Sequence, residues 1–408
     1  MHVLVFNCGS SSLKYRLLAM PAETELAGGE AQRISPKTAV PSRIVHRVGG
    51  EEQIVTRPLP DHAAAFAAVM ELLGRQPQLF PGVIAHRVVH GGERFPGPTL
   101  LDRAAFHDLE QLSDLAPLHN PPALALIRAC RERYPSLPQV AVFDTAFHAT
   151  IPEHARQYGL PRRLTRELGL RKYGFHGTSH RYVMRAAAKF LRIPVPRFSA
   201  VSAHLGSGGA SLCAIVDGCS VDNTMGYSSL PGLLMSTRGG DLDPAVPLNL
   251  MAGNTTGAAD LEAALYRGSG VLGMSGTSSD IRDLLAGPGA AAGPGSASAR
   301  TTETYLWRLR TYLGAYLLTA GNPATLIFTD TIGEMVPAVR WSVCSGLEEL
   351  GLAIDPALNE SSGPLPRDIA TADSPIRILV MATNEELAIA RETHELLSCP
   401  AAALEGAQ

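Results

Sequence analysis

The sequence predicts an α/β fold made of two related domains with a cleft between them. Strand-like and helix-like runs alternate along the 408 residues, and such alternation is typical of α/β proteins. Two segments, residues 3–18 and 200–216, share one pattern: an apolar strand, a turn of glycine and serine, and a second strand. This pattern predicts a β-hairpin. Its occurrence near the start of each half indicates a duplicated domain.

Further elements are predicted toward the C-terminus. Residues 286–298 are rich in glycine, alanine, proline and serine, which predicts a flexible surface loop. We expect a helix over 305–320, a strand over 376–381 and a closing helix over 385–397. Thr383, with Glu386 three residues later, predicts a capping box at the start of the closing helix. Such a box would occupy Glu386 and leave Glu385 available for a ligand.

Composition argues against several classes of protein. The net charge is -3, and no long basic or acidic run indicates binding to nucleic acid or to an anionic membrane. No signal peptide or membrane-spanning run is apparent. The six cysteines are scattered without a CxxC pair, which favours free thiols in a reducing compartment. We therefore expect a cytoplasmic protein that would hold an anionic substrate with a few placed cations.

The two glycine-rich turns are candidate phosphate sites. Small residues let backbone N–H groups approach an anion closely, and the first turn adds Ser10, Ser12 and Lys14. The second turn is Gly206-Ser-Gly-Gly209, with Gly206 and Gly208 as candidate contacts. Each could equally be an ordinary hairpin turn, and no Walker motif is present. The pair together points to phosphate more strongly than either turn alone.

Several charged residues and histidines occur beside glycines or at predicted strand ends. Arg87 and Arg238 could each grip a carboxylate through two hydrogen bonds, although a surface ion pair is the alternative for either. His176 and His180 have metal-like spacing, but no third ligand is evident, so zinc is disfavoured. Asp144 ends an apolar run, where it could bind magnesium or cap a turn.

Ten ordered motifs resemble those of the acetokinase family, which comprises acetate, propionate and butyrate kinases. They are NCGSSSLKY, HRVVHGGERF, APLHNPPAL, FDTAFH, KYGFHGTSHRYV, TMGYSSLPGL, STRGGDLDP, GMSGTSSDIRD, VCSGLEELG and TNEELAIARET. The resemblance implies the two-domain fold of sugar kinases and actin, of the ribonuclease H-like type, with the active site in the cleft. It implies an N-terminal domain over 1–150, a nucleotide-binding and dimerisation domain over 151–384, and a C-terminal helix, about 385–408, packed back on the first.

The resemblance also implies roles for individual residues. Asp144, Arg87, Arg238 and His176 would be catalytic, the two arginines holding the acyl carboxylate and the transferring phosphoryl group. Asn7 and Glu385 would help bind Mg²⁺ or Mn²⁺, and His119 would be a supporting residue. Contacts to ATP are implied for Lys14, Ser10, Ser12, His204, Gly206, Gly208, Asp280, Arg282 and Gly333. The acyl pocket would be lined by Val89, Leu118, Phe175 and Ser229.

The implied reaction is reversible transfer of the γ-phosphate of ATP to acetate, without a phosphoenzyme, in a cytoplasmic homodimer. A propionate or butyrate kinase, or an impaired nucleotide-binding homologue, is the alternative. The chain departs from the family pattern at four places. The second turn has an extra glycine, Ser229 replaces a proline, Ser236 replaces the glycine of the usual MGTR, and Asp330–Met335 replaces the usual AGIGEN.

Overall fold

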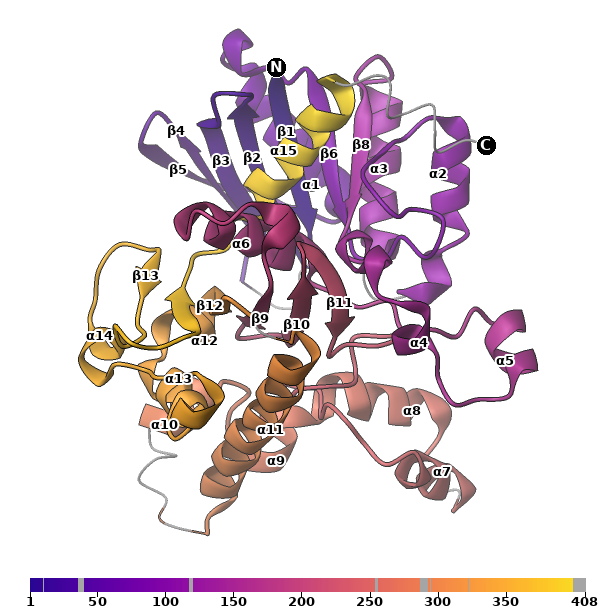
Figure 1. Ribbon diagram of the computed structural model, residues 1–408. Coiled ribbons are helices and arrows are strands. Elements are labelled where there is room, and N and C mark those ends of the chain that lie inside the picture. Colours follow the sequence, from indigo (N-terminus) through magenta and orange to yellow (C-terminus); the bar gives the residue numbers. More distant parts are fainter. Residues whose placement is uncertain are drawn as a thin grey trace. The chain divides into compact units, whose positions relative to one another are not determined.

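The computed structural model describes residues 1–9, 11–35, 40–116, 120–253, 256–286, 293, 295–321 and 323–398. They form two compact units (Figure 1). The first unit comprises Met1–Phe147 with the chain from Asn384 onward, and the second comprises His148–Thr383. The predicted α/β class is confirmed, because each unit is built on one mixed β-sheet with helices packed against it.

The sheet of the first unit has eight strands in the order β5-β4-β3-β2-β1-β6-β8-β7. Neighbours from β5 to β1 are antiparallel, β1, β6 and β8 are parallel, and β7 is antiparallel to β8. The strands are β1 (His2–Cys8), β2 (Ser12–Ala19), β3 (Thr24–Gln32), β4 (Arg43–Val48), β5 (Glu51–Thr56), β6 (Val83–Val88), β7 (Thr99–Leu100) and β8 (Gln139–Phe143).

Helices cover both faces of this sheet, and the alternation of β1 shows how. Val3 and Val5 pack against α15 (Glu385–Ser398), whereas Leu4 and Phe6 pack against the opposite layer. That layer contains α1 (His62–Gly74) and α3 (Asn120–Arg133), with α2 (Arg103–Glu110) beside α3. The central strands are therefore apolar on both faces, as parallel strands covered on two sides should be.

The sheet of the second unit has six strands in the order β11-β10-β9-β12-β14-β13. They are β9 (Ala200–Leu205), β10 (Ala210–Val216), β11 (Cys219–Asn223), β12 (Thr325–Thr329), β13 (Arg367–Asp368) and β14 (Arg377–Val380). An antiparallel hairpin followed by two parallel strands occurs in both sheets: β2-β1-β6-β8 and β10-β9-β12-β14. Both predicted hairpins are thus confirmed, and the two units share one topological core.

Helix α6 packs on β9 and β12, and α11 packs on β9, β10 and β11. The helices of this unit are α4 (Glu153–Arg156), α5 (Arg162–Glu167), α6 (Gly177–Phe190), α7 (Ala245–Ala252), α8 (Ala258–Ala263), α9 (Gly270–Ser275), α10 (Ile281–Ala286), α11 (Ala297–Thr319), α12 (Asp330–Met335), α13 (Pro337–Cys344) and α14 (Pro356–Glu360). No helix in the described part of the chain combines the length and apolar character needed to cross a bilayer.

The late elements match their predictions except at their boundaries. The helix predicted over 305–320 is confirmed as α11, but it begins at Ala297 because the Ser296 hydroxyl accepts from Ala299 N–H and caps it. The predicted loop over 286–298 therefore loses its last two residues to α11 and its first to α10. Most of the remainder, 287–292 and 294, lies outside the described residues.

The predicted capping box is wrong. The capping side chain of α15 is that of Asn384, whose Oδ1 accepts from Leu387 N–H at 3.1 Å. Thr383 lies one residue too early, and its hydroxyl instead bonds Ser179 at 2.8 Å. Glu386 is therefore the second residue of the helix and has no capping partner to reach back to.

We expect Asn384→Ala to lower the free energy of unfolding by about 0.5–2 kcal/mol, since the first turn of α15 loses its cap. The same amide oxygen also accepts from Arg16 Nη1 at 2.8 Å, so the loss should fall in the upper half of that range. Glu386→Ala is the matched control, and urea denaturation is the measurement. A larger loss in the Glu386 variant would restore the capping box.

Candidate functional site

Three polar residues meet where the parallel strands of the first unit end. Asn7 lies near the end of β1, Arg87 lies near the end of β6, and Asp144 follows β8 directly. Arg87 donates to Asp144 through two bonds, Nε to Oδ1 at 3.1 Å and Nη2 to Oδ2 at 2.6 Å. Its Nη1 donates to Asn7 Oδ1 at 3.1 Å. This two-bond pairing orients the guanidinium rigidly at the strand ends.

Glu385 completes this cluster from the first turn of α15. Its Oε2 lies 3.5 Å from Arg87 Nη1 and accepts from Asn7 Nδ2 at 3.5 Å. The side chain of Asp144 is 2% exposed, that of Arg87 19% and that of Glu385 15%. Burial alone would lower the pKa of Arg87, but Asp144 and Glu385 more than offset it and raise that pKa. Arg87 therefore stays cationic, and two carboxyl groups lie against it.

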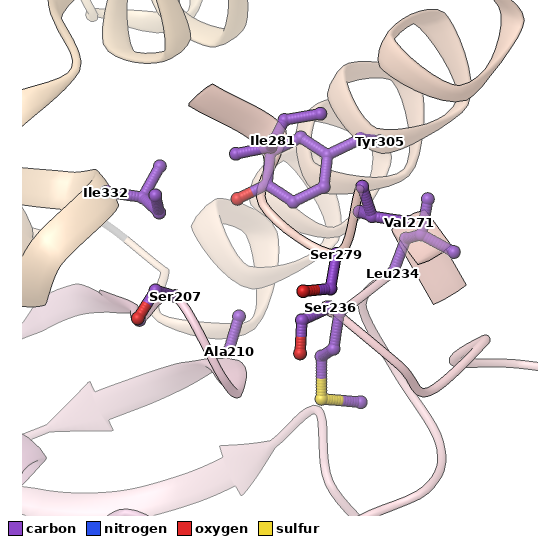
Figure 2. A pocket seen from close by; sticks show the side chains of 11 residues that line it. Ser207, Ala210, Leu234, Ser236, Val271, Ser279, Ile281, Tyr305 and Ile332 are labelled. Atoms are coloured by element: carbon purple, nitrogen blue, oxygen red, sulfur yellow. The ribbon is translucent and has the colours of Figure 1, made fainter. Parts of the chain in front are cut away.

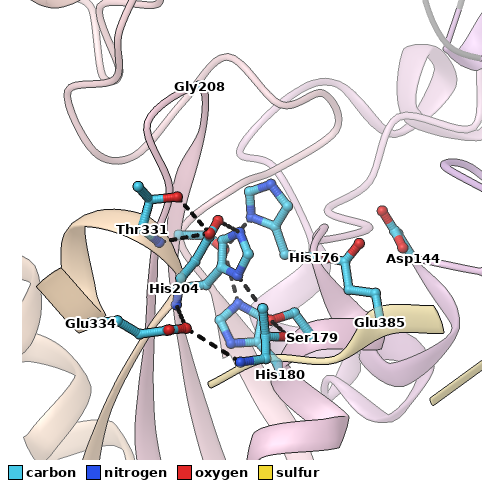
Figure 3. A network of polar contacts seen from close by, with 12 residues as sticks. Asp144, His176, Ser179, His180, His204, Gly208, Thr331, Glu334 and Glu385 are labelled. Carbon is cyan, nitrogen blue, oxygen red and sulfur yellow. Dashed lines mark hydrogen bonds and ion pairs between the residues drawn. The ribbon is translucent and has the colours of Figure 1, made fainter. Parts of the chain in front are cut away.

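The donor set of this cluster fits a hard cation. Asp144 and Glu385 carry carboxylate oxygens, and Asn7 carries a carboxamide oxygen (Figure 3 draws the two acids). In the described residues, no group of three or more His, Cys, Asp or Glu side chains is arranged to hold a metal alone. Mg²⁺ needs no such cage, because it commonly takes one or two carboxylates together with substrate phosphates.

The first glycine-rich turn follows Asn7 directly. Gly9 N–H donates to Ser12 O at 2.9 Å and closes the turn, while the Gly9 carbonyl lies 2.8 Å from His62 Nε2. Lys14 stands opposite Asn7 in the β1–β2 register, so both side chains are on one face of the hairpin. Lys14 is exposed. Ser10, also predicted here, lies outside the described residues.

A histidine cluster occupies the equivalent strand ends of the second unit (Figure 3). His204 lies in β9 opposite Ser211 of β10. The Ser211 hydroxyl bonds both His176 Nδ1 and His180 Nε2 at 2.9 Å. The ring centroids of His176 and His204 are 4.3 Å apart, and the two ring planes are tilted by 31°. Thus His176, predicted to be catalytic, and His204, predicted to contact ATP, lie in direct contact.

His180 holds this cluster in place. Its Nδ1 bonds Ser202 Oγ at 2.9 Å, so both ring nitrogens are engaged by serine hydroxyls. Burial, then the neighbouring His148 and His204, lowers the pKa of His180 well below its usual value. A neutral, fully bonded ring is a structural link, which agrees with the prediction that His176 and His180 do not form a zinc site.

Arg238 lies beside the second glycine-rich turn. It donates to Ser229 O through Nη1 at 2.9 Å and to Gly208 O through Nη2 at 3.2 Å. Burial lowers its pKa, and no carboxylate pairs with it in the described part of the chain. A largely buried guanidinium bonded only to carbonyls retains positive charge that an anionic ligand can neutralise.

Two glycines make room for Arg238. A Cβ at Gly209 would lie 2.5 Å from Arg238 Nη2 and 3.5 Å from His176 Nε2. Glycine at position 209 thus lets this guanidinium approach the turn. Gly270, at φ +67, brings its Cα close to the loop: a Cβ there would lie 2.2 Å from Met235 O and 2.7 Å from Arg238 N. Only glycine satisfies both the conformation and the space.

A small pocket adjoins the same turn (Figure 2). It encloses about 240 Å³, including space open to solvent. One end is formed by the turn residues Gly206 and Ser207. The walls are mainly apolar, with one tyrosine and two serines: Ala210, Leu234, Met235, Ser236, Val271, Ser279, Ile281, Tyr305 and Ile332. An apolar slot beside a glycine-rich turn suits a flat aromatic base attached to phosphate.

Other predicted residues are placed as follows. Asp280 and Arg282 flank Ile281 of the pocket wall and pair with each other at 2.5 Å. Gly333 is buried in α12, where its carbonyl accepts from Arg340. Phe175 is buried and Val89 is partly buried. Leu118 and His119 lie outside the described residues.

Sequence reasoning missed several members of these clusters. Ser179 Oγ bonds His204 Nδ1 at 2.9 Å, and Asp330 Oδ2 lies 3.1 Å from His204 Nε2. Ser202 and Ser211 were also missed. Ser202, His204 and Ser211 alternate with apolar residues on β9 and β10, and that alternation was a signal that could have found them. The contact of Asp330 had no local signal, because it depends on β12 pairing with β9.

Comparison with known proteins confirms the resemblance. The family model described as the Acetokinase family matches residues 2–391. An acetate kinase from Alkaliphilus metalliredigens is 43% identical over 405 residues, covering 97% of this chain and 100% of that protein. The crystal structure of Porphyromonas gingivalis acetate kinase superposes with TM-score 0.89 at 35% identity, covering 97% of this chain and 99% of that one. A propionate kinase from Francisella tularensis gives 0.87 at 35% identity, covering 96% and 98%.

We expect Arg87→Ala to lower both turnover and stability. Removing one partner of a buried pair costs about 3–5 kcal/mol, because Asp144 is left buried and uncompensated. Arg87→Ala combined with Asp144→Asn should recover part of the unfolding free energy without recovering turnover.

Arg238→Ala is the matched control for stability, since it leaves no carboxylate unpaired. Urea denaturation should show a smaller loss for Arg238→Ala than for Arg87→Ala. Equal losses in the single Arg87 variant and the double variant would show that the ion pair does not govern stability here.

Proposed function

Because the chain belongs to the acetokinase family, we propose that it catalyses reversible transfer of the ATP γ-phosphate to acetate, giving acetyl phosphate and ADP. The carrying observation is Arg238: a largely buried arginine without a paired carboxylate, beside a glycine-rich turn and the ring of His176. That combination is suited to a phosphoryl group, whose negative charge spreads over several oxygens. The stabilisation of this charge is commonly the largest part of catalysis.

The proposed mechanism is direct in-line transfer. A carboxylate is ionised near neutral pH, so acetate needs no strong general base. The protein has only to align the two substrates and to neutralise charge as it develops. We assign His176 and Arg238 to the phosphoryl group, because His176 Nε2 and Arg238 Nη2 converge on Gly209. We assign Arg87, held by Asp144, to the carboxylate or the transferring group.

For the first unit we propose a metal and phosphate role. Asn7, Asp144 and Glu385 would hold Mg²⁺ or Mn²⁺, since the cluster has more carboxylates than cations. When bound, the metal supplies charge neutralisation at the phosphates. Ser10, Ser12 and Lys14 would lie along those phosphates. Lys14 shares a face of the β1–β2 hairpin with Asn7, which supports this assignment.

For the second unit we propose the nucleotide site. Gly206, Gly208 and His204 would contact phosphate, and the pocket beside the turn would receive the base. Ser279 and Ile281 line that pocket. Asp280 and Arg282, as their neighbours in sequence, would then lie at the adenosine end. Gly333 lies in α12, whose Ile332 forms part of the wall.

The acyl pocket is proposed from the family resemblance, with Val89, Leu118, Phe175 and Ser229. Ser229 stands where the family usually has proline, and its carbonyl holds Arg238 at 2.9 Å. Serine is smaller than the rigid proline ring, so the pocket should accept a longer acid. Propionate use is therefore the second candidate activity.

We propose that the protein is a cytoplasmic homodimer. Helix α7 buries none of its residues, and Val246, Leu248 and Met251 are exposed on it. Exposed apolar side chains grouped on one helix indicate a protein interface, and a second copy is the commonest partner for such a surface. The described cysteines are free thiols, which suits a reducing compartment.

The test is a hydroxamate assay with ATP, Mg²⁺ and hydroxylamine, using acetate, propionate and butyrate in turn. Acetate should yield acyl hydroxamate, and propionate should be used with similar efficiency. The extra methylene of propionate contributes about 1–3 kcal/mol of binding when an apolar pocket has room for it. Strong selectivity for acetate would therefore show that Ser229 does not enlarge the acyl pocket. Binding of ATP without any hydroxamate would favour an impaired homologue.

We expect Glu385→Ala to raise the Mg²⁺ concentration needed for half-maximal turnover, because the metal cluster loses a carboxylate. Glu386→Ala is the matched control, one residue along the same helix. The measurement is a magnesium titration of initial rate at saturating ATP and acetate. A greater metal defect in the Glu386 variant would transfer the role to that residue.

A further inference from the structure

Asp330 has an unusual backbone conformation at the second glycine-rich turn. It follows β12 and starts α12 with φ +63, in the left-handed region that non-glycine residues rarely occupy. Such a conformation is strained and persists only when its surroundings hold it. Here Asp330 N–H donates to Glu334 Oε1 at 2.9 Å, and the Asp330 carboxylate accepts from Thr331 N–H at 2.6 Å.

The carboxylate of Asp330 lies against the turn itself. Its Oδ2 is 3.1 Å from His204 Nε2, and a Cβ at Gly206 would lie only 2.5 Å from the same oxygen. The side chain is 30% exposed, so a ligand at the turn can reach it. Asp330 also engages His204, a side chain assigned above to phosphate.

This carboxylate is ionised at neutral pH. Burial alone would raise the pKa of Asp330, but the hydrogen bonds and charge of His204, with the donors of Thr331, lower it below its usual value. An ionised group therefore stands where the proposed nucleotide phosphates must lie. Glu334 is the acidic residue that contacts Asp330. Its carboxylate accepts from the backbone N–H groups of Asp330 and Thr383.

We propose that Asp330 is a specificity-determining residue that makes this turn discriminate against metal-free nucleotide in favour of nucleotide complexed with a divalent cation. The proposal rests on the proposed nucleotide site. A free nucleoside di- or triphosphate brings three or four negative charges to a turn that already holds a carboxylate. A divalent cation removes two of those charges, which weakens the repulsion. The carboxylate also competes with the phosphate for the ring of His204.

Isothermal titration calorimetry of the full chain with ADP and ATP tests this, in excess EDTA and in excess Mg²⁺. Asp330→Asn removes the charge and keeps the shape, and asparagine tolerates the left-handed backbone. In EDTA at low salt, Asp330→Asn should bind ADP and ATP about tenfold more tightly than the unaltered protein does. The reason is that the variant no longer holds a negative charge a few ångströms from the phosphates. In Mg²⁺ the gain should be clearly smaller, and added salt should reduce both gains.

Asp217→Asn is the matched control, because Asp217 is also an aspartate at positive φ in this unit but is exposed at the turn after β10. Asp217→Asn should leave the affinity for nucleotide unchanged both in EDTA and in Mg²⁺. Asp330→Gly, which suits the same backbone conformation, replaces Asp330→Asn should that variant not fold. Unchanged or weaker binding in EDTA, or equal gains with and without Mg²⁺, would overturn the proposal. Failure of the unaltered protein and of both variants to bind any nucleotide would overturn the proposed function itself, and this inference with it.

Discussion

The constraint on which this structure depends is the parallel alignment of three strands in each unit. Parallel strands end at one edge of their sheet, so the residues that follow them are brought together without regard to sequence distance. In the first unit this edge carries Asn7, Arg87 and Asp144. In the second, His204 lies near the end of β9, and Asp330 follows β12. Members of both polar clusters therefore lie at these two edges.

The two sheet edges have the same strand geometry but carry side chains of different charge. Asn7 faces Lys14 across the first hairpin, and His204 faces Ser211 across the second at the equivalent register. Around the first pair, carboxylates outnumber the buried arginine, which favours a cation. Around the second, histidines and an arginine without a carboxylate partner favour an anion, and the carboxylate of Asp330 moderates that preference. The two units thus share the strand geometry and differ in the charged residues at their strand ends.

Local pattern predicted the elements well and their contacts poorly. Both hairpins, the strand-end positions of Arg87 and Asp144, and the helix at 385 follow from periodicity and turn residues, which are local properties. The cap of α15 differs from its prediction by one residue, because Thr383 and Asn384 are both good caps and tertiary contact with Ser179 decides between them. The Arg87–Asp144 bond joins residues 57 apart in sequence, and periodicity carries no signal for such a contact.

The position of Asp330 depends in turn on a charge buried beneath it. Arg340 is fully buried, and its guanidinium donates to Gly333 O at 2.9 Å, Glu334 O at 3.0 Å and the side chain of Asn359 at 2.8 Å. Burial lowers the pKa of Arg340 to about 10, so it remains charged at neutral pH. Its bonds fix the C-terminal carbonyls of α12, where few backbone partners exist. They thereby fix Glu334, which accepts from Asp330 N–H, and so the strained residue at the glycine-rich turn is held from inside the unit.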